Sequence, residues 1–218
     1  LNHHFRGQTT IAQIAMVNVG LLLAVRFLLP DALALGLALT GVVLAAQGRD
    51  RPAATFLALA VLTKTNYFVF PLALGVWLWP QARRRAWWLT VAPAVPAALW
   101  TAYVFGQFGA STAGNLSFPF VGFFKAIGLW SDVSTGEMVM AILAAMLVAI
   151  GAVLAVATAE RLLRWTLLAW VGVGLISSEF VWEFGNNTLR VLAPLWSLAA
   201  VAGAVYLSSK RSRRNLPV

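Results

Sequence analysis

Long apolar runs separated by few charges set the strongest limit on what this 218-residue chain can fold into. Seven runs can be marked, at residues 9–29, 31–47, 53–79, 87–105, 138–158, 165–181 and 190–208. A helix needs roughly 20 apolar residues to cross a bilayer, so most of these runs fit one crossing. Only 11% of the residues are charged, against about 25% in soluble domains. The sequence therefore predicts an all-α, polytopic transmembrane helix bundle with about six spanning helices.

The basic residues lie in short clusters between the apolar runs, and they predict the orientation of the chain. A net charge of +9 would suggest nucleic-acid binding in a soluble protein, but this clustering is typical of positive-inside topology and argues against a nucleic-acid partner. Residues 1–209 are expected to form the transmembrane domain, with residues 106–137 as an external loop. Residues 210–218 are expected to form a basic cytoplasmic tail.

The run at residues 53–79 is too long for a single comfortable crossing. As one straight helix it would measure roughly 40 Å, against a hydrocarbon core of about 30 Å. Arg49 and Arg51 fit the inner side only if the run enters and returns on that side. We expect two short helices joined around residues 64–66, as a broken or re-entrant pair. The alternative is one tilted crossing with both arginines outside.

Lys64, near the middle of this run, is the first candidate for a functional residue. An ionisable group at membrane depth is costly, so it is a functional hypothesis by default. Lys64 can bind a phosphate in a polar pocket, with Thr65 and Asn66 as neighbouring donors. It can equally reach the interface or pair with a carboxylate of another helix.

Arg190 is the second candidate, in the polar stretch that separates the last two apolar runs. An arginine there can hold a phosphate or carboxylate with two hydrogen bonds. It can also pair with Glu179 or Glu183 and only fix the loop. Neighbouring Asn186 and Asn187 add further polar groups.

The segment 106–137 carries a third polar site and an aromatic pattern. Asn115 and Ser117 can bind sugar hydroxyls or form a turn before Pro119. Five large apolar residues recur at helical spacing, and they predict either an interfacial amphipathic helix or a loop packed on the bundle: Phe120, Phe123, Phe124, Ile127 and Trp130. Four tryptophans flank the arginines at 83–85 and predict an interfacial anchor there: Trp77, Trp79, Trp87 and Trp88.

Several of these stretches resemble multi-pass membrane glycosyltransferases of the GT-C class. The similar segments read "RGQTTIAQIAMVNVGLLL", "AATFLALAVLTKTNYFVFPLALGVWLWPQARRR", "GNLSFPFVGFFKAIG" and "NNTLRVLAPLWSLAA". The resemblance implies sugar transfer from a polyprenyl-phosphate donor to a lipid, glycan or protein acceptor. It also implies a prokaryotic inner membrane, and the basic cluster at residues 210–214 places the C-terminus on the cytoplasmic side. Lys64 and Arg190 would then bind the donor phosphate, with Gln8 and Asn66 as polar neighbours.

One departure from the family pattern concerns its catalytic base, an acidic residue in the first external loop. Asp31 follows a later helix and does not match it, so the catalytic residue is left unassigned. The chain begins at Leu1 and is expected to be the C-terminal part of such an enzyme, lacking that loop, or an inactive relative.

Two other functions fit the same residues. The chain could be a transporter with an anion site at Lys64, or a non-catalytic membrane subunit that packs against other membrane subunits. The expected partners are membrane lipids and a lipid-phosphate-linked sugar. No cofactor and no metal site is expected, because the chain has no cysteine and its two histidines, His3 and His4, are neighbours that do not converge on one ion.

Overall fold

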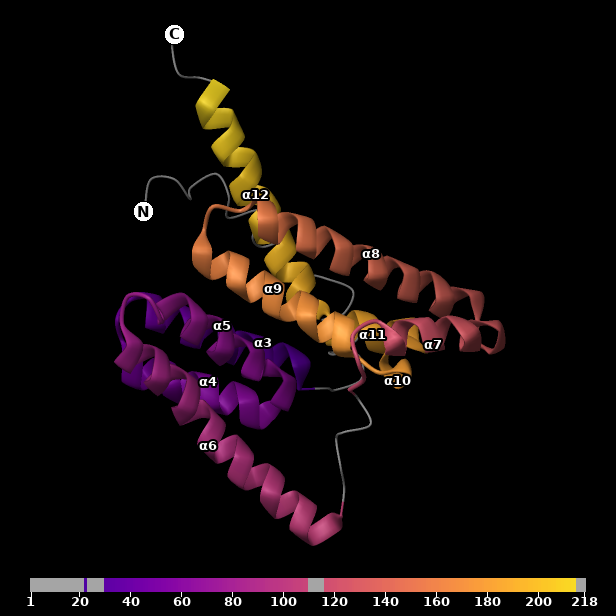
Figure 1. Ribbon diagram of the computed structural model, residues 1–218, viewed down its shortest axis with the longest axis horizontal. Helices are drawn as coiled ribbons and strands as arrows, with labels where there is room; N and C mark the ends of the chain where they lie inside the picture. The colour runs from indigo at the N-terminus through magenta and orange to yellow at the C-terminus, as the bar shows by residue number, and fades with distance from the viewer. Residues whose placement is uncertain (1–21, 23–29, 110–115, 215–218) are drawn as a thin grey trace.

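The computed structural model describes residues 22, 30–109 and 116–214, and these residues form an all-helical bundle (Figure 1). The only extended pairing among them is an isolated bridge between Leu116 and Ser177. The α-helices are α3 (Asp31–Ala46), α4 (Asp50–Thr63), α5 (Val69–Leu78), α6 (Arg83–Phe108), α7 (Val121–Leu129), α8 (Thr135–Ala157), α9 (Arg161–Ile176), α10 (Glu179–Trp182), α11 (Gly185–Val191) and α12 (Ala193–Arg214), and the 3₁₀ turns are η1 (Thr65–Phe68) and η3 (Trp130–Asp132). The expected all-α class is confirmed for the described residues.

Two groups of helices make up the bundle. In the first, α3 packs along α4, and α6 packs against both α4 and α5. In the second, α8 packs against α9, α11 and α12. Contacts between α5 and α9 join the two groups, as the central part of Figure 1 shows.

The run at residues 53–79 is broken where the sequence predicts it. Helix α4 ends at Thr63, Lys64 is extended with φ −157° and ψ 115°, and η1 leads into α5. Pro71 explains why α5 begins only at Val69, because a proline lacks the N–H of an inner helical position and fits the first turn. Arg85, in the first turn of α6 after the short connection from α5, pairs with Asp50 at the start of α4. The segment thus leaves and returns to the same end of the bundle.

The helices that could cross a membrane are fewer than the six that the sequence predicts. Within the described residues, α6 over Arg83–Gln107 and α8 are long and apolar enough. The pair α11 and α12, bent by 58° over Gly185–Tyr206, makes a third if both parts belong to one span. The runs at 31–47 and 165–181 form helices of 16 residues, which are short of the roughly 20 that a crossing needs. The run at 9–29 lies outside the described residues.

The aromatic segment after residue 116 forms the short helix α7, which packs on the end of α9 and on α10. Only part of its predicted face is buried: Phe123 stacks edge-on against Trp182, at 5.0 Å between centroids, whereas Phe124 is exposed. Gly122 lets α7 approach this closely, because a Cβ there would lie 2.1 Å from the Ser177 carbonyl oxygen. The segment is therefore helical, as the first alternative predicts, and packs on the bundle, as the second predicts; its place at a membrane interface stays a prediction.

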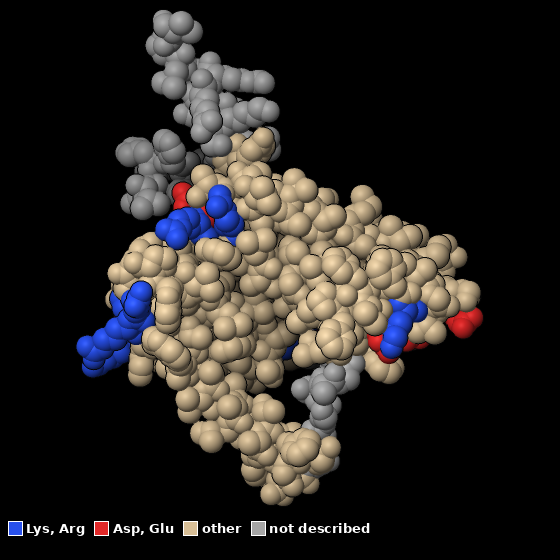
Figure 2. Space-filling model, in the orientation of Figure 1, with Lys and Arg blue, Asp and Glu red and all other residues tan. Residues whose placement is uncertain are grey.

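Charged side chains lie mainly at the two ends of the bundle (Figure 2). Basic groups gather at the left of the view, over the starts of α4 and α6 and the turn between α8 and α9. Acidic groups and one basic group lie at the right, near α7 and α10. Residues without a formal charge cover most of the face between them.

Candidate functional site

Asp31 is the centre of the candidate site, at the first position of α3. Its side chain is 2% exposed, which is rare for a carboxylate without a charged partner. The positive end of the α3 dipole favours a negative charge in the first turn. That effect is too small to offset burial of a charge, so other groups must neutralise Asp31.

Lys64 is the first of these groups. Its Nζ forms a hydrogen-bonded ion pair with Oδ1 of Asp31. The pairing follows from the hairpin of α3 and α4, which places the start of α3 beside the end of α4. The break after Thr63 frees Lys64 from the helix, and its side chain remains 22% exposed.

Arg190 is the second cation, and it comes from α11 in the other helix group. Its Nε lies 3.7 Å from Oδ2 of Asp31, and its NH2 group donates to Oδ1 of Asn187 at 2.7 Å. Helix α11 can reach this position because Gly185 packs directly on α8, where a Cβ would lie 2.2 Å from the Glu137 carbonyl oxygen. Two segments far apart in the sequence therefore place their cations on one carboxylate.

An aromatic cluster of Tyr67, Phe70 and Trp170 packs next to the backbone of Asp31. The Tyr67 hydroxyl donates to the Asp31 carbonyl oxygen at 3.0 Å. The Tyr67 ring stacks on Phe70 at 5.9 Å and meets Trp170 of α9 edge-on at 5.4 Å. Because Tyr67 and Trp170 are both fully buried, this cluster fixes η1 and the start of α3 relative to α9.

Two buried polar atoms of the candidate residues have no hydrogen-bond partner within the described part of the chain. They are Oδ1 of Asn66, in η1, and Nε of Arg190. A buried polar atom without a partner costs free energy, and native proteins leave few of them. Arg190 thus has a hydrogen-bond donor available beside Asp31, and η1 has an acceptor available in Asn66.

The cluster carries an excess of positive charge. Lys64 and Arg190 contribute two positive charges, and Asp31 contributes one negative charge. No other acidic side chain in the described ranges pairs with either cation. The arrangement can therefore accept one further negative charge from a ligand.

The structure brings together three of the residues that sequence analysis singled out. Lys64 and Arg190 both contact Asp31, and Asn66 lies two residues after Lys64, in η1. Gln8 and Asn115 lie outside the described residues. Lys64 pairs with a carboxylate of another helix, as its simpler interpretation predicts, and Arg190 pairs with the same carboxylate and not with the predicted glutamates. That carboxylate is Asp31, and in the described residues neither Glu179 nor Glu183 pairs with Arg190; Glu179 lies 3.8 Å from Lys125.

Asp31 is the residue that sequence analysis missed as a member of the site. Asp31 does not match the position of the family's catalytic acid, and the family pattern gives it no other role. A signal was present, since an acidic residue flanked by Pro30 and an apolar run needs a buried cation. The partner could be identified only from the way α3, α4 and α11 pack.

The fold and site define an all-helical protein with an ion cluster between two helix groups and with helices able to cross a membrane. Scans of family models, of curated proteins and of solved structures found no match to this chain.

Proposed function

We propose that this chain is a membrane glycosyltransferase of the GT-C type, or part of one, and that Lys64 and Arg190 bind the phosphate of a polyprenyl-phosphate sugar donor. The observation that supports this most is the convergence of these two cations on the buried Asp31. Asp31 acts as a positioning residue, because it holds both cations in one place when no donor is bound.

The charge of the cluster suits this donor. A polyprenyl-phosphate sugar is a phosphodiester with one negative charge, and the cluster has one positive charge in excess. Lysine and arginine both bind phosphate through charge-assisted hydrogen bonds. The Nε of Arg190, which lies near Asp31 but makes no hydrogen bond, can donate to a phosphate oxygen. Oδ1 of Asn66 can accept a hydrogen bond from a sugar hydroxyl.

The same cations would assist the transfer step. The bond between the anomeric carbon and the phosphate oxygen breaks, and the acceptor oxygen bonds to the anomeric carbon. The departing polyprenyl phosphate gains negative charge as that bond breaks. Fixed cations in a site of low dielectric stabilise this charge without having to reorganise. The proton of the acceptor hydroxyl passes to the departing polyprenyl phosphate, so the products carry the same net charge as the donor.

A membrane setting fits this chemistry, because the donor's polyprenyl chain lies in lipid. We place the whole bundle in a prokaryotic inner membrane, with about six crossings and a cytoplasmic C-terminus. The acceptor is a lipid, glycan or protein, and other membrane subunits are possible partners.

Binding of undecaprenyl phosphate to the purified chain in dodecyl maltoside tests the proposal, with undecaprenol as the ligand that lacks a phosphate. We expect the phosphate form to bind and Lys64→Gln to weaken it by roughly tenfold or more, because a hydrogen bond to a charged group contributes about 1.5–3 kcal/mol. Lys125→Gln is the matched control, since Lys125 is 62% exposed and pairs with Glu179 and not with Asp31. Equal affinity for undecaprenol, or no effect of Lys64→Gln, would overturn the proposal.

A further inference from the structure

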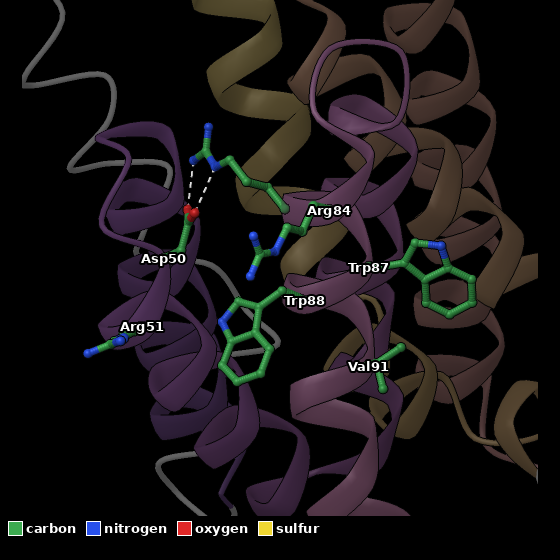
Figure 3. A pocket seen from close by; sticks show the side chains of 7 residues that line it. Asp50, Arg51, Arg84, Trp87, Trp88 and Val91 are labelled. Carbon is green, nitrogen blue, oxygen red and sulfur yellow. Dashed lines mark hydrogen bonds and ion pairs between the residues drawn. The ribbon is translucent and has the colours of Figure 1, made fainter.

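A groove of about 600 Å³ lies between the starts of α4 and α6, at the basic end of the bundle and separate from the Asp31 cluster (Figure 3). It is lined by Asp50, Arg51, Arg84, Arg85, Trp87, Trp88 and Val91. Figure 3 shows Arg84 and Trp88 extending from α6 toward α4, with Trp87 on the other side of α6.

The arginines of this groove differ in whether their charge is neutralised. Arg85 donates to both carboxylate oxygens of Asp50, at 2.7 and 2.8 Å, and to the Ala45 carbonyl oxygen at 3.0 Å. Arg84 and Arg51 have no acidic partner in the described part of the chain. The groove thus has one fixed ion pair as its wall and two exposed cations that remain free to bind an anion.

The start of α6 adds to this positive potential. The helix begins with three arginines, has no acidic residue in its first turn, and its N-cap residue Ala82 provides no side-chain cap. Cations are unfavourable at the positive end of a helix dipole, and an anion there would relieve the repulsion. The sequence places no such anion on α6 itself.

Exposed tryptophans point to the source of the anion. Trp87 is 60% exposed and Trp88 is 50% exposed, and indole rings prefer the level of lipid headgroups at a membrane surface. Basic pockets between membrane helices bind the headgroups of anionic lipids. A soluble anion would need the cations but would gain nothing from apolar rings beside them.

We infer that this groove is a binding site for the headgroup of an anionic glycerophospholipid. The phosphate lies against Arg84, with Arg51 closing on it from α4, and the upper acyl chain lies against Trp88 and Val91. The site is independent of the proposed glycosyl transfer.

Native mass spectrometry of the full chain in detergent tests this inference with phosphatidylglycerol, phosphatidylcholine and inorganic phosphate. We expect phosphatidylglycerol to be retained in preference to phosphatidylcholine. Arg84→Gln should weaken its binding about fivefold and Arg51→Gln to a similar extent, because each basic residue near an anionic lipid contributes about 1 kcal/mol. Inorganic phosphate at the same concentration should not compete.

Arg83→Gln is the matched control. It removes the same charge from the same helical turn, but Arg83 lies 5.8 Å from the Trp79 ring centroid and does not line the groove. Unchanged retention of phosphatidylglycerol by a double variant that carries both Arg84→Gln and Arg51→Gln would overturn the inference. So would an equal loss from Arg83→Gln, which would indicate unspecific attraction, or equally strong binding of inorganic phosphate. The melting temperature of each variant checks that it is folded.

Discussion

Oδ2 of Asp31 and Nε of Arg190 lie 3.7 Å apart, although Asp31 is the first residue of α3 and Arg190 lies in the last turn of α11. The contact joins the two helix groups at a point where Lys64 also pairs with Asp31. Because the carboxylate is buried between two cations, the stability of the fold and the chemistry of the site depend on the same three side chains.

Replacement of the central carboxylate is expected to destabilise the protein. Asp31→Asn leaves Lys64 and Arg190 mostly buried, close together and without a counter-ion. Breaking a buried ion pair in this way costs about 3 kcal/mol, so the melting temperature in dodecyl maltoside should fall clearly.

Two further variants give that prediction its controls. Asp132→Asn, at an exposed position of η3, should change stability by less than about 0.5 kcal/mol. Adding Lys64→Met to Asp31→Asn should recover part of the loss, because one unpaired charge is removed. An Asp31→Asn protein as stable as the parent would show that the cluster does not hold the helix groups together.

A methyl group at Gly185 is expected to displace α11 and with it Arg190. A Cβ there would lie 2.2 Å from the Glu137 carbonyl oxygen and 2.5 Å from the Ala141 nitrogen, and backbone atoms cannot move aside easily. Gly185→Ala should therefore cost about 1–3 kcal/mol and weaken binding of undecaprenyl phosphate.

Gly172→Ala provides the comparison within the same helix group. Gly172 lies inside α9, and a Cβ there would meet nothing within 4 Å. Alanine favours helix by about 1 kcal/mol over glycine, so this variant should be at least as stable as the parent. Thermal unfolding of both variants is the measurement, and equal behaviour of the two would contradict the packing of α11 on α8.

Truncation of Trp170 is expected to lower the free energy of unfolding, because its ring packs in the aromatic cluster next to Asp31. Its ring is fully buried against Tyr67 and Phe70, so Trp170→Ala should cost about 3–5 kcal/mol. Trp170→Phe should cost much less, because it keeps a ring there and removes an Nε1 that has no partner among the described residues. Equal losses of the two variants in denaturant unfolding would contradict a stabilising role for the packing of this ring against Tyr67 and Phe70.

The local features of the fold could be predicted from the sequence, and its long-range contacts could not. The break at Lys64 follows from the excess length of the run and from its charged centre. The end of α3 could be predicted, because its apolar run stops at Gln47 and charged residues follow. The end of α9 at Ile176 could not, because apolar residues recur soon after Ser177. Periodicity also could not show which face of α7 would be buried, since Gly122 decides its approach to Ser177.

The candidate site shows the same division. Lys64 and Arg190 stand out because charges are costly in apolar surroundings. Their meeting at Asp31 depends on the packing of α11 against α8 and of α5 against α9. A single sequence contains no signal for such contacts between distant segments.

The most direct test of the central claim is a contact between the Lys64 ammonium and the donor phosphate. The chain has three lysines, Lys64, Lys125 and Lys210, so ¹⁵N-lysine labelling gives few signals. Rotational-echo double-resonance NMR with undecaprenyl phosphate as the only source of ³¹P should dephase one lysine signal, and Lys64→Gln should remove that signal. Saturating undecaprenyl phosphate that dephases no lysine, or that dephases a signal still present in Lys64→Gln, would contradict the account.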